Sequence, residues 1–290
     1  MEGLYGICAA MCTPFTEDGE RIDERAFKKQ IDILMEAGSH IVLVCGGTGE
    51  FAYLRPEEKR RLAETAARHI DGRCRLMVQT SAIGTRDAVE NAKFAEGAGA
   101  DALLILPPYF EGPDARGVYY HYERISEAIK IPIVAYNIPV HSGFDITPEF
   151  FTRLREIDNV QYIKDSTGDL VRIRQLIASG ARVFNGGDPI AFDSLMSGAV
   201  GCIWGACNAM PKEAVALYDL VSEGNVAAAH RLWQRLLPAN LFFWSHVYNA
   251  AVKAATNLRI NQVGPCRKPV LPLTEAEAQE LAKALASLDG

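Results

Sequence analysis

Residues 131–136, IPIVAY, and residues 160–164, VQYIK, are two short apolar runs separated by a stretch of helical period. That stretch, Pro148–Glu156, follows Thr147, so that a threonine and a proline stand at the N-cap and at the first helical position. A strand, a helix and a second strand in this order predict a βαβ unit with parallel strands.

The same unit repeats along the chain, because runs rich in β-branched residues alternate with amphipathic stretches. The predicted strands are Gly6–Thr13, His40–Cys45, Arg75–Thr80, Ala102–Leu106, Ile133–Tyr136, Val160–Lys164, Arg182–Asn185 and Val200–Trp204. The predicted helices between them are Asp23–Ala37, Pro56–His69, Arg86–Glu96, Arg116–Ile129, Pro148–Glu156, Asp169–Ala178 and Ile190–Ser197. Eight such units form either a closed barrel or a large doubly wound sheet.

The loops decide between these two architectures. A doubly wound sheet often carries a GxGxxG loop after its first strand, but here Thr13-Pro14-Phe15 follows. Unusual residues instead follow many of the strands, in the loops Gly46–Glu50, Pro107–Phe110, Tyr136–Ser142, Lys164–Asp169 and Gly186–Asp188. A ring of functional loops at the carboxyl ends of the strands is typical of a (β/α)₈ TIM barrel. We therefore predict a barrel over residues 1–210.

The last part of the chain, residues 211–290, has a different character. Its predicted helices are Glu213–Val221, Val226–Leu237, Asn240–Asn257 and Thr274–Leu288. We expect this segment to be a helical extension packed on the barrel.

Composition narrows the class of protein. The 290 residues include 30 Lys and Arg against 36 Asp and Glu, so the formal net charge is −6 and nucleic acid is not an expected partner. Apolar stretches such as Ile41–Cys45 are far shorter than the roughly 20 residues of a membrane span. Seven cysteines without CxxC spacing favour buried, reduced thiols in a cytoplasmic protein.

Lys164 is the first candidate for chemistry. Alternation along the strand predicts that Val160, Tyr162 and Lys164 share one face, which would point Lys164 into the barrel at its catalytic end. Burial disfavours the charged ammonium, so an inward amine keeps a nucleophilic neutral fraction suited to Schiff-base chemistry on a carbonyl. The alternative is a strand-end lysine that points to solvent or pairs with Asp165.

Tyr136 strengthens that hypothesis because it closes the preceding strand, and neighbouring strands lie about 4.8 Å apart. A phenol beside the amine can carry protons while a carbinolamine forms and breaks down. The alternative is a tyrosine that only caps the barrel.

Two glycine-rich loops are candidate binding segments. In Gly46–Glu50, backbone N–H groups can turn towards an anion and Thr48 adds a hydroxyl, so a small carboxylate would fit. Asn185–Asp188 also follows a strand, and Gly187 is placed to contact a substrate. Either loop can instead be a plain tight turn. His141, in the loop after Tyr136, can hydrogen-bond a substrate carboxylate or hydroxyl, or it can be a bystander.

A metal-dependent barrel is a further alternative, with Glu50, Asp165 and Asp188 as ligands. The histidines show neither HxH nor HExxH spacing, so we expect no metal site.

Four motifs together resemble the dihydrodipicolinate synthase / N-acetylneuraminate lyase family. They are Gly46-Gly47-Thr48-Gly49-Glu50, Tyr136-Asn137-Ile138-Pro139, the run Tyr162–Asp169, and Gly198-Ala199-Val200-Gly201 with Asn208 and Pro211. The resemblance covers essentially the whole chain. It implies a class I, Schiff-base-forming lyase acting on pyruvate or another 2-oxo acid, without a cofactor, as a homotetramer built as a dimer of dimers.

The resemblance also implies roles for single residues. Lys164 matches the Schiff-base lysine and Tyr136 the proton-shuttling tyrosine. Gly47 and Thr48 match the pair that holds the 2-oxo acid carboxylate, and Ile203 lines the same pocket.

Three positions depart from the dihydrodipicolinate synthase pattern. Gly47 replaces a hydroxyl residue, Phe110 stands beside Tyr109 where the neighbouring subunit supplies a tyrosine, and His141 replaces an arginine that holds the aldehyde's carboxylate. Phe51 after the glycine-rich loop is similar to the branch that dehydrates 5-keto-4-deoxyglucarate.

These departures favour cleavage or dehydration of a sugar-acid-type 2-oxo acid. Two alternatives stay open: condensation of pyruvate with an aldehyde, and a catalytically idle protein that binds a 2-oxo acid.

Overall fold

The computed structural model describes residues 3–288, and within them eight parallel strands form one closed barrel in which β1 pairs with both β2 and β8. The strands are β1 (Gly6–Ala10), β2 (Ile41–Val44), β3 (Arg75–Gln79), β4 (Ala102–Ile105), β5 (Ile133–Asn137), β6 (Val160–Asp165), β7 (Arg182–Asn185) and β8 (Gly201–Trp204). The predicted (β/α)₈ barrel is confirmed, and all eight predicted strands are present with ends that differ by a few residues.

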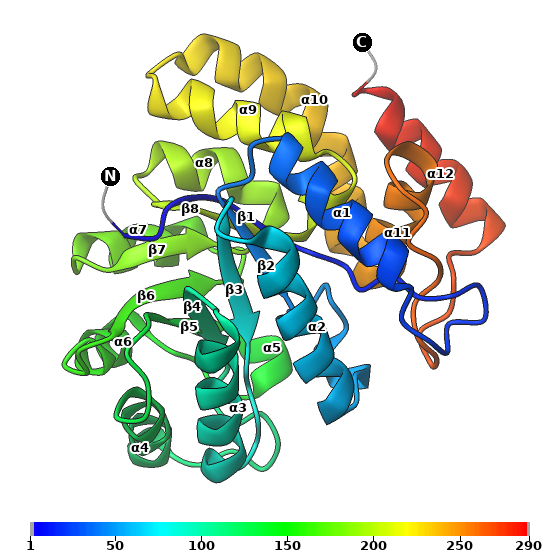
Figure 1. The fold of residues 1–290 in the computed structure, drawn as a ribbon. Helices are drawn as coiled ribbons and strands as arrows, with labels where there is room; N and C mark the ends of the chain where they lie inside the picture. Colours follow the sequence, from blue (N-terminus) through cyan, green and yellow to red (C-terminus); the bar gives the residue numbers. More distant parts are fainter. Residues whose placement is uncertain (1–2, 289–290) are drawn as a thin grey trace.

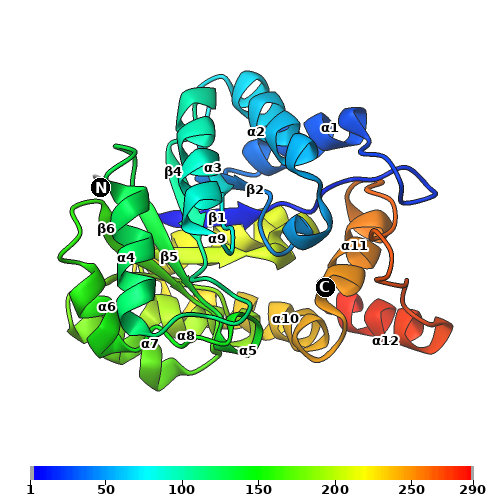
Figure 2. The same ribbon diagram turned by 90° about the horizontal axis from the view of Figure 1, so that it is seen from below.

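Helices surround this barrel and continue beyond it (Figure 1). They are α1 (Glu24–Glu36), α2 (Pro56–Ile70), α3 (Thr85–Ala98), α4 (Ala115–Ser126), α5 (Pro139–Ser142), α6 (Pro148–Leu154), α7 (Leu170–Ala178), α8 (Ala191–Met196), α9 (Pro211–Ser222), α10 (Val226–Ser245), α11 (Tyr248–Arg259) and α12 (Glu275–Ala286). Three short 3₁₀ turns, η1 (Phe51–Tyr53), η2 (Asp188–Ile190) and η3 (Gly205–Asn208), follow β2, β7 and β8. Figure 2 shows α11 and α12 on the side of the barrel away from α4 and α6.

The core has two layers, because successive side chains of each strand point to opposite faces. The larger layer lies between the strands and the helices and includes Ile7, Val44 and Leu103. The smaller layer fills the barrel interior. Its buried members on the strands are Cys8, Ala10, Ile41, Leu43, Met77, Ala102, Leu104, Val134, Tyr136, Tyr162, Phe184 and Ile203. The interior is therefore a packed core and not a channel.

One irregularity sets which side chains of β6 face inward. The pairing of β5 with β6 shifts between Ile133 and Val134, so that Ile133 pairs with Val160 but Val134 pairs with Tyr162. The extra residue reverses the alternation. Val160 consequently packs in the outer layer, and the prediction that it shares a face with Tyr162 and Lys164 is wrong.

The C-terminal helices differ from the prediction in the place where one helix ends and the next begins. The expected break at Pro238 is wrong, because α10 runs through this proline to Ser245. Trp233, Leu236, Phe242 and Phe243, on both sides of the proline, are buried in the outer core, and this packing holds the two halves in one helix. The chain breaks instead at His246, which has extended backbone. The helix α9 packs against α8 and β1, and the predicted division at residue 210 stays a prediction.

A buried ion pair ties α11 to the loop after β2. The Nζ atom of Lys253 lies 2.7 Å from Glu50 Oε1, and both side chains are almost fully buried. Lys253 also donates to the carbonyl of Pro265, and the other Glu50 oxygen accepts from the backbone N–H of Arg267. The lysine amine lies 4.2 Å from the centre of the Phe15 ring. Both charges are therefore compensated inside the protein.

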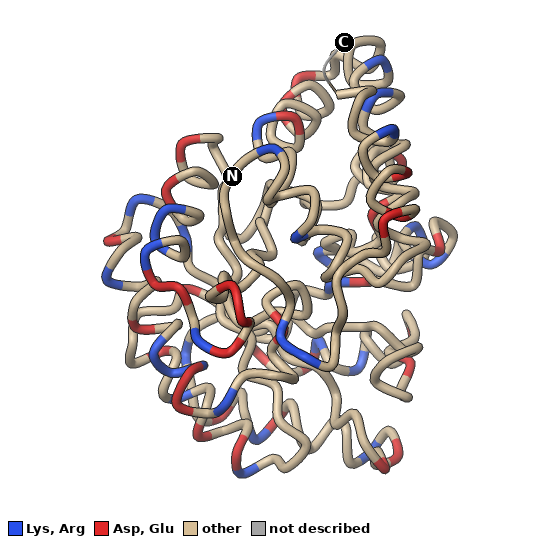
Figure 3. The backbone as a smooth tube through the Cα atoms, turned by 90° about the vertical axis from the view of Figure 1, so that its right-hand side faces the viewer, with Lys and Arg blue, Asp and Glu red and all other residues tan. Residues whose placement is uncertain are grey.

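Charged residues of both signs are interspersed over the outer helices (Figure 3). No helix within residues 3–288 has the length and apolarity that crossing a bilayer requires.

The ion pair yields a stability prediction. Lys253→Met leaves the Glu50 carboxylate buried without its partner, so we expect the free energy of unfolding to fall by about 3–5 kcal/mol. Glu50→Gln/Lys253→Met removes both charges and should lose clearly less. Urea unfolding of the two variants measures the difference.

The control is Arg61→Met, which breaks the exposed pair with Glu24 and should cost no more than about 1 kcal/mol. An equal loss in the Lys253 single variant and the double variant would contradict the assignment of the cost to an uncompensated charge.

Candidate active site

Lys164 and Tyr136 lie side by side at the carboxyl ends of their strands. They are register partners of β6 and β5, and each is only 6% exposed. The Nζ atom of Lys164 lies 4.1 Å from the centre of the Tyr136 ring. The structure therefore brings the two residues together inside the barrel, at the rim where TIM-barrel enzymes carry their chemistry.

The loop after β7 packs against the stem of this lysine. A Cβ atom on Gly186 would lie 2.1 Å from Ser166 Oγ and 2.7 Å from Lys164 Cε, so only glycine fits there. The N–H of Gly187 donates to Asn185 Oδ1, and Asn185 Nδ2 donates to the Gly187 carbonyl. The sequence analysis missed this use of Asn185, which directs the backbone N–H of Gly187 to the protein itself.

The glycine-rich loop after β2 reaches the same place. A Cβ atom on Gly47 would lie 3.8 Å from Tyr136 Oη, so the position opposite the phenol is open. Thr48 is buried beside it, and the Gly47 carbonyl accepts a hydrogen bond from Asn249 Nδ2 at 3.1 Å. Ile203 of β8 belongs to the barrel interior. Gly47 therefore faces Tyr136, and Ile203 belongs to the same buried cluster as this tyrosine.

The remaining predicted residues lie further out. His141 is exposed on the short helix α5. Tyr109 is half-buried, its ring meets Phe51 edge to face, and burial raises the pKa of its phenol. Phe110 is 66% exposed. These three residues do not contact Lys164 through any interaction found among residues 3–288.

Asp188 and Tyr248 form a pair that the sequence analysis did not foresee. Tyr248 begins α11, and its phenol donates to Asp188 Oδ2 at 2.8 Å. Burial raises the pKa of Asp188 to about 7, while the hydrogen bond from Tyr248 and the charge of Lys164 act in the opposite direction. Burial and the neighbouring Asp188 raise the pKa of Tyr248. Asp188 is therefore an electrostatic neighbour of Lys164.

Asp165, the residue after Lys164, belongs to a different network. It accepts from Asn137 Nδ2 at 2.8 Å and from the hydroxyl of Thr167. Burial raises its pKa, and these two hydrogen bonds oppose that rise. The same asparagine also donates to Asp145 at 3.1 Å.

The three carboxylates of the metal hypothesis are therefore engaged separately. Glu50 pairs with Lys253, Asp165 bonds to Asn137 and Thr167, and Asp188 bonds to Tyr248. Among residues 3–288, no group of three metal-ligating side chains is placed to share an ion.

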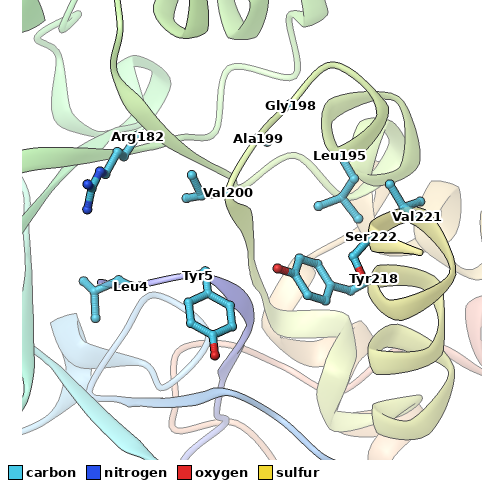
Figure 4. A pocket seen from close by; sticks show the side chains of 10 residues that line it. All are labelled: Leu4, Tyr5, Arg182, Leu195, Gly198, Ala199, Val200, Tyr218, Val221 and Ser222. Atoms are coloured by element: carbon cyan, nitrogen blue, oxygen red, sulfur yellow. The ribbon is translucent and has the colours of Figure 1, made fainter. Parts of the chain in front are cut away.

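A cavity of about 370 Å³ opens at the opposite end of the barrel, where the strands begin (Figure 4). Leu4, Tyr5, Arg182 and Val200 line it from the barrel, and Tyr218 lines it from α9. The Arg182 guanidinium donates to Tyr162 Oη at 2.7 Å. This cavity lies at the end of the barrel opposite the catalytic rim, at the face of a TIM barrel that supports stability more than catalysis.

Comparison with known proteins identifies the family of the chain. The family model described as the dihydrodipicolinate synthetase family matches residues 3–288. The 4-hydroxy-tetrahydrodipicolinate synthase of Methanothrix thermoacetophila is 31% identical over 287 residues, which cover 98% of this chain and 96% of that protein.

Two solved structures share the fold over nearly the whole chain. A putative dihydrodipicolinate synthetase from Pseudomonas aeruginosa has a TM-score of 0.94 and 33% identity, covering 99% of this chain and 100% of the other. YagE, a prophage protein of the dihydrodipicolinic acid synthase family from E. coli K12 solved in complex with pyruvate, has a TM-score of 0.93 and 28% identity, covering 98% of each chain. Together with the family model, these matches show that the chain belongs to the dihydrodipicolinate synthetase family, a family of class I lyases.

Proposed function

We propose that this protein is a Schiff-base-forming lyase whose Lys164 amine attacks the keto carbon of pyruvate or a related 2-oxo acid. The observation that carries the proposal is the buried amine of Lys164 against the ring of Tyr136 at the catalytic rim. A neutral amine in a water-poor site is the nucleophile that imine formation requires. The idle-binder alternative offers no use for such an amine.

The substrate carboxylate is held, in this proposal, by the loop after β2. The backbone N–H groups around Gly47 and the hydroxyl of Thr48 are donors for an anion. Asn249 and the Glu50–Lys253 pair keep this loop in place. Ile203 supplies an apolar wall, and His141 and Gly187 are proposed to contact the substrate.

Tyr136 moves the protons of the reaction. Its phenol donates to the carbinolamine hydroxyl, which leaves as water, and the imine remains on Lys164. The imine then withdraws electrons as the substrate loses a proton from C3, so the proposed cycle needs no cofactor.

The names of the relatives support one direction over the other. The name of the 4-hydroxy-tetrahydrodipicolinate synthase from Methanothrix thermoacetophila supports condensation of pyruvate with an aldehyde, and the pyruvate complex of YagE supports a pyruvate-type substrate in either direction. We therefore place condensation ahead of the sugar-acid cleavage or dehydration that the loop departures favoured. The homotetramer also stays a proposal, with Tyr109 and Phe110 as residues near a subunit contact.

Sugar-acid chemistry remains the second candidate because of one observation. Gly47 carries no hydroxyl side chain, and a Cβ atom at this position would meet only Tyr136 Oη, at 3.8 Å, so the loop departs from the dihydrodipicolinate synthase pattern beside the phenol. A panel of 2-oxo sugar acids, assayed beside pyruvate with aldehydes, distinguishes the two directions.

The imine is tested by trapping. Pyruvate with borohydride should leave a stable pyruvyl adduct on Lys164 of the wild type, found by intact mass and peptide mapping. Lys164→Ala should lose the adduct and turnover while remaining folded.

Lys212→Ala, which removes an exposed lysine of α9, is the control. Unchanged turnover in Lys164→Ala would refute the mechanism. If pyruvate gives no adduct, longer 2-oxo acids decide between a selective pocket and the idle binder.

Tyr136→Phe removes only the phenolic hydroxyl. We expect kcat/KM to fall by about 10²–10⁴-fold, the usual size of an acid–base contribution, with the melting temperature little changed. Steady-state kinetics measure the loss. A decrease below threefold would mean that the proton takes another route.

Gly186→Ala tests the close packing against Lys164. The added Cβ must displace Ser166 or the lysine stem, so we expect kcat/KM to fall at least about 100-fold. Gly97→Ala is the matched control, because Gly97 lies inside α3 with nothing within 4 Å of its Cβ position. That control should keep full activity and gain up to about 1 kcal/mol of stability. Equal activity of both variants would show that Lys164 tolerates displacement.

A further inference from the structure

Asp188 is a buried carboxyl group that the reaction cycle above leaves unused. It lies in the turn η2 directly after β7, is 3% exposed, and accepts the phenol of Tyr248 at 2.8 Å. A buried carboxyl group is costly unless it is hydrogen-bonded or neutralised. The cost of burying Asp188 near Lys164 suggests that this carboxyl group has a role in the active site.

Gly205, just after β8, shows where the phenol of Tyr248 points. A Cβ atom on Gly205 would lie 2.6 Å from Tyr248 Oη and 2.6 Å from Thr48 Oγ1. Since both oxygens are that close to one point, they lie at most 5.2 Å apart. Such a gap is spanned directly or by one water molecule.

Tyr136 lies on the other side of the loop that carries Thr48. The residue before Thr48 is Gly47, whose Cβ position lies 3.8 Å from Tyr136 Oη. Tyr136 and Tyr248 are also close enough to interact electrostatically. Two residues without side chains, Gly47 and Gly205, thus leave room for hydroxyl groups that arrive from three different elements.

The titratable groups around Asp188 come from several elements. Lys164 faces it from β6, Tyr248 from α11, Cys202 from β8 and Cys207 from η3. The pKa values of the two cysteines are raised by burial, so both stay neutral thiols near pH 7. Burial raises the pKa of Asp188 to about 7, so this carboxyl group can gain or lose a proton near neutral pH.

We propose that Asp188 is the proton store of the active site and that Tyr248 passes its proton to Tyr136 during imine formation, directly or through one water molecule. This inference rests on the proposed Schiff-base function and extends it. Tyr248 acts here as a proton-transferring residue, and Asp188 acts through it.

The step balances in atoms and charge. The neutral amine of Lys164 adds to the keto carbon, and the proton that the nitrogen then loses converts the carbonyl oxygen into a hydroxyl. That hydroxyl leaves as water with the proton of Tyr136, which is replaced from Asp188 through Tyr248. The products are the iminium on Lys164, one water molecule and the Asp188 carboxylate, and solvent later returns the proton. No oxidant, reductant or co-reactant is needed.

Two conservative variants test the relay. Tyr248→Phe removes the hydroxyl, and Asp188→Asn keeps an acceptor for Tyr248 but cannot supply a proton. Timed mixing with pyruvate, borohydride quenching and intact mass give the rate of imine formation. Both variants should form the adduct about 100-fold more slowly than the wild type, with the final yield retained. Tyr218→Phe, at the opposite end of the barrel, should match the wild type.

The pH dependence separates the relay from a structural role. Asp188 has its pKa raised to about 7, so the acid form is complete below this pH and is lost above it. The ratio of the wild-type rate to the Asp188→Asn rate should therefore fall about tenfold per pH unit above pH 7. A constant ratio across pH 6–9, or wild-type rates in both variants, would overturn the relay while leaving the imine intact. Absence of any adduct in the wild type, with every 2-oxo acid tried, would overturn the proposed function and the relay with it.

Discussion

The register between β5 and β6 is the constraint on which the site depends. The shift between Ile133 and Val134 inserts one residue into β6, and the side chains that follow change faces. Because strand alternation has a period of two, loss of that single residue would turn Lys164 out of the barrel. With the shift, Lys164 is placed opposite Tyr136 with its amine over the ring. The sheet itself aligns Lys164 with Tyr136, and the loops after β2, β7 and β8 add the residues that surround this pair.

The C-terminal helices are part of the site and not merely a support for the barrel. Three residues of α11 reach the loops of the rim: Tyr248 bonds to Asp188, Asn249 to the Gly47 carbonyl, and Lys253 to Glu50. One short helix thereby joins the loops after β2 and β7. A rigid helix holds such contacts more closely than a free loop would, which suits a site whose groups must stay aligned.

Much of the fold was accessible from the sequence because parallel strands, buried on both faces, read as short apolar runs. The same reasoning paired Tyr136 with Lys164, since consecutive strands of a barrel are neighbours. It failed for Val160, because a one-residue bulge leaves no mark in an apolar run, and for Pro238, because tertiary packing outweighed the local cost of a proline. The pair of Asp188 and Tyr248 was missed because 60 residues separate them and only the closed fold brings them together.

Charge balance explains why a carboxyl group of this kind stands near Lys164. Imine formation converts a neutral amine into an iminium, which places a lasting positive charge in a water-poor interior. Asp165 is nearer in sequence, but its oxygens accept from Asn137 and Thr167 in a separate network. Asp188 bonds to a phenol, and a positive charge on Lys164 lowers its pKa, so the iminium favours the carboxylate form. A carboxyl group that gives up its proton as the iminium forms becomes the negative partner of that new positive charge and stabilises the product.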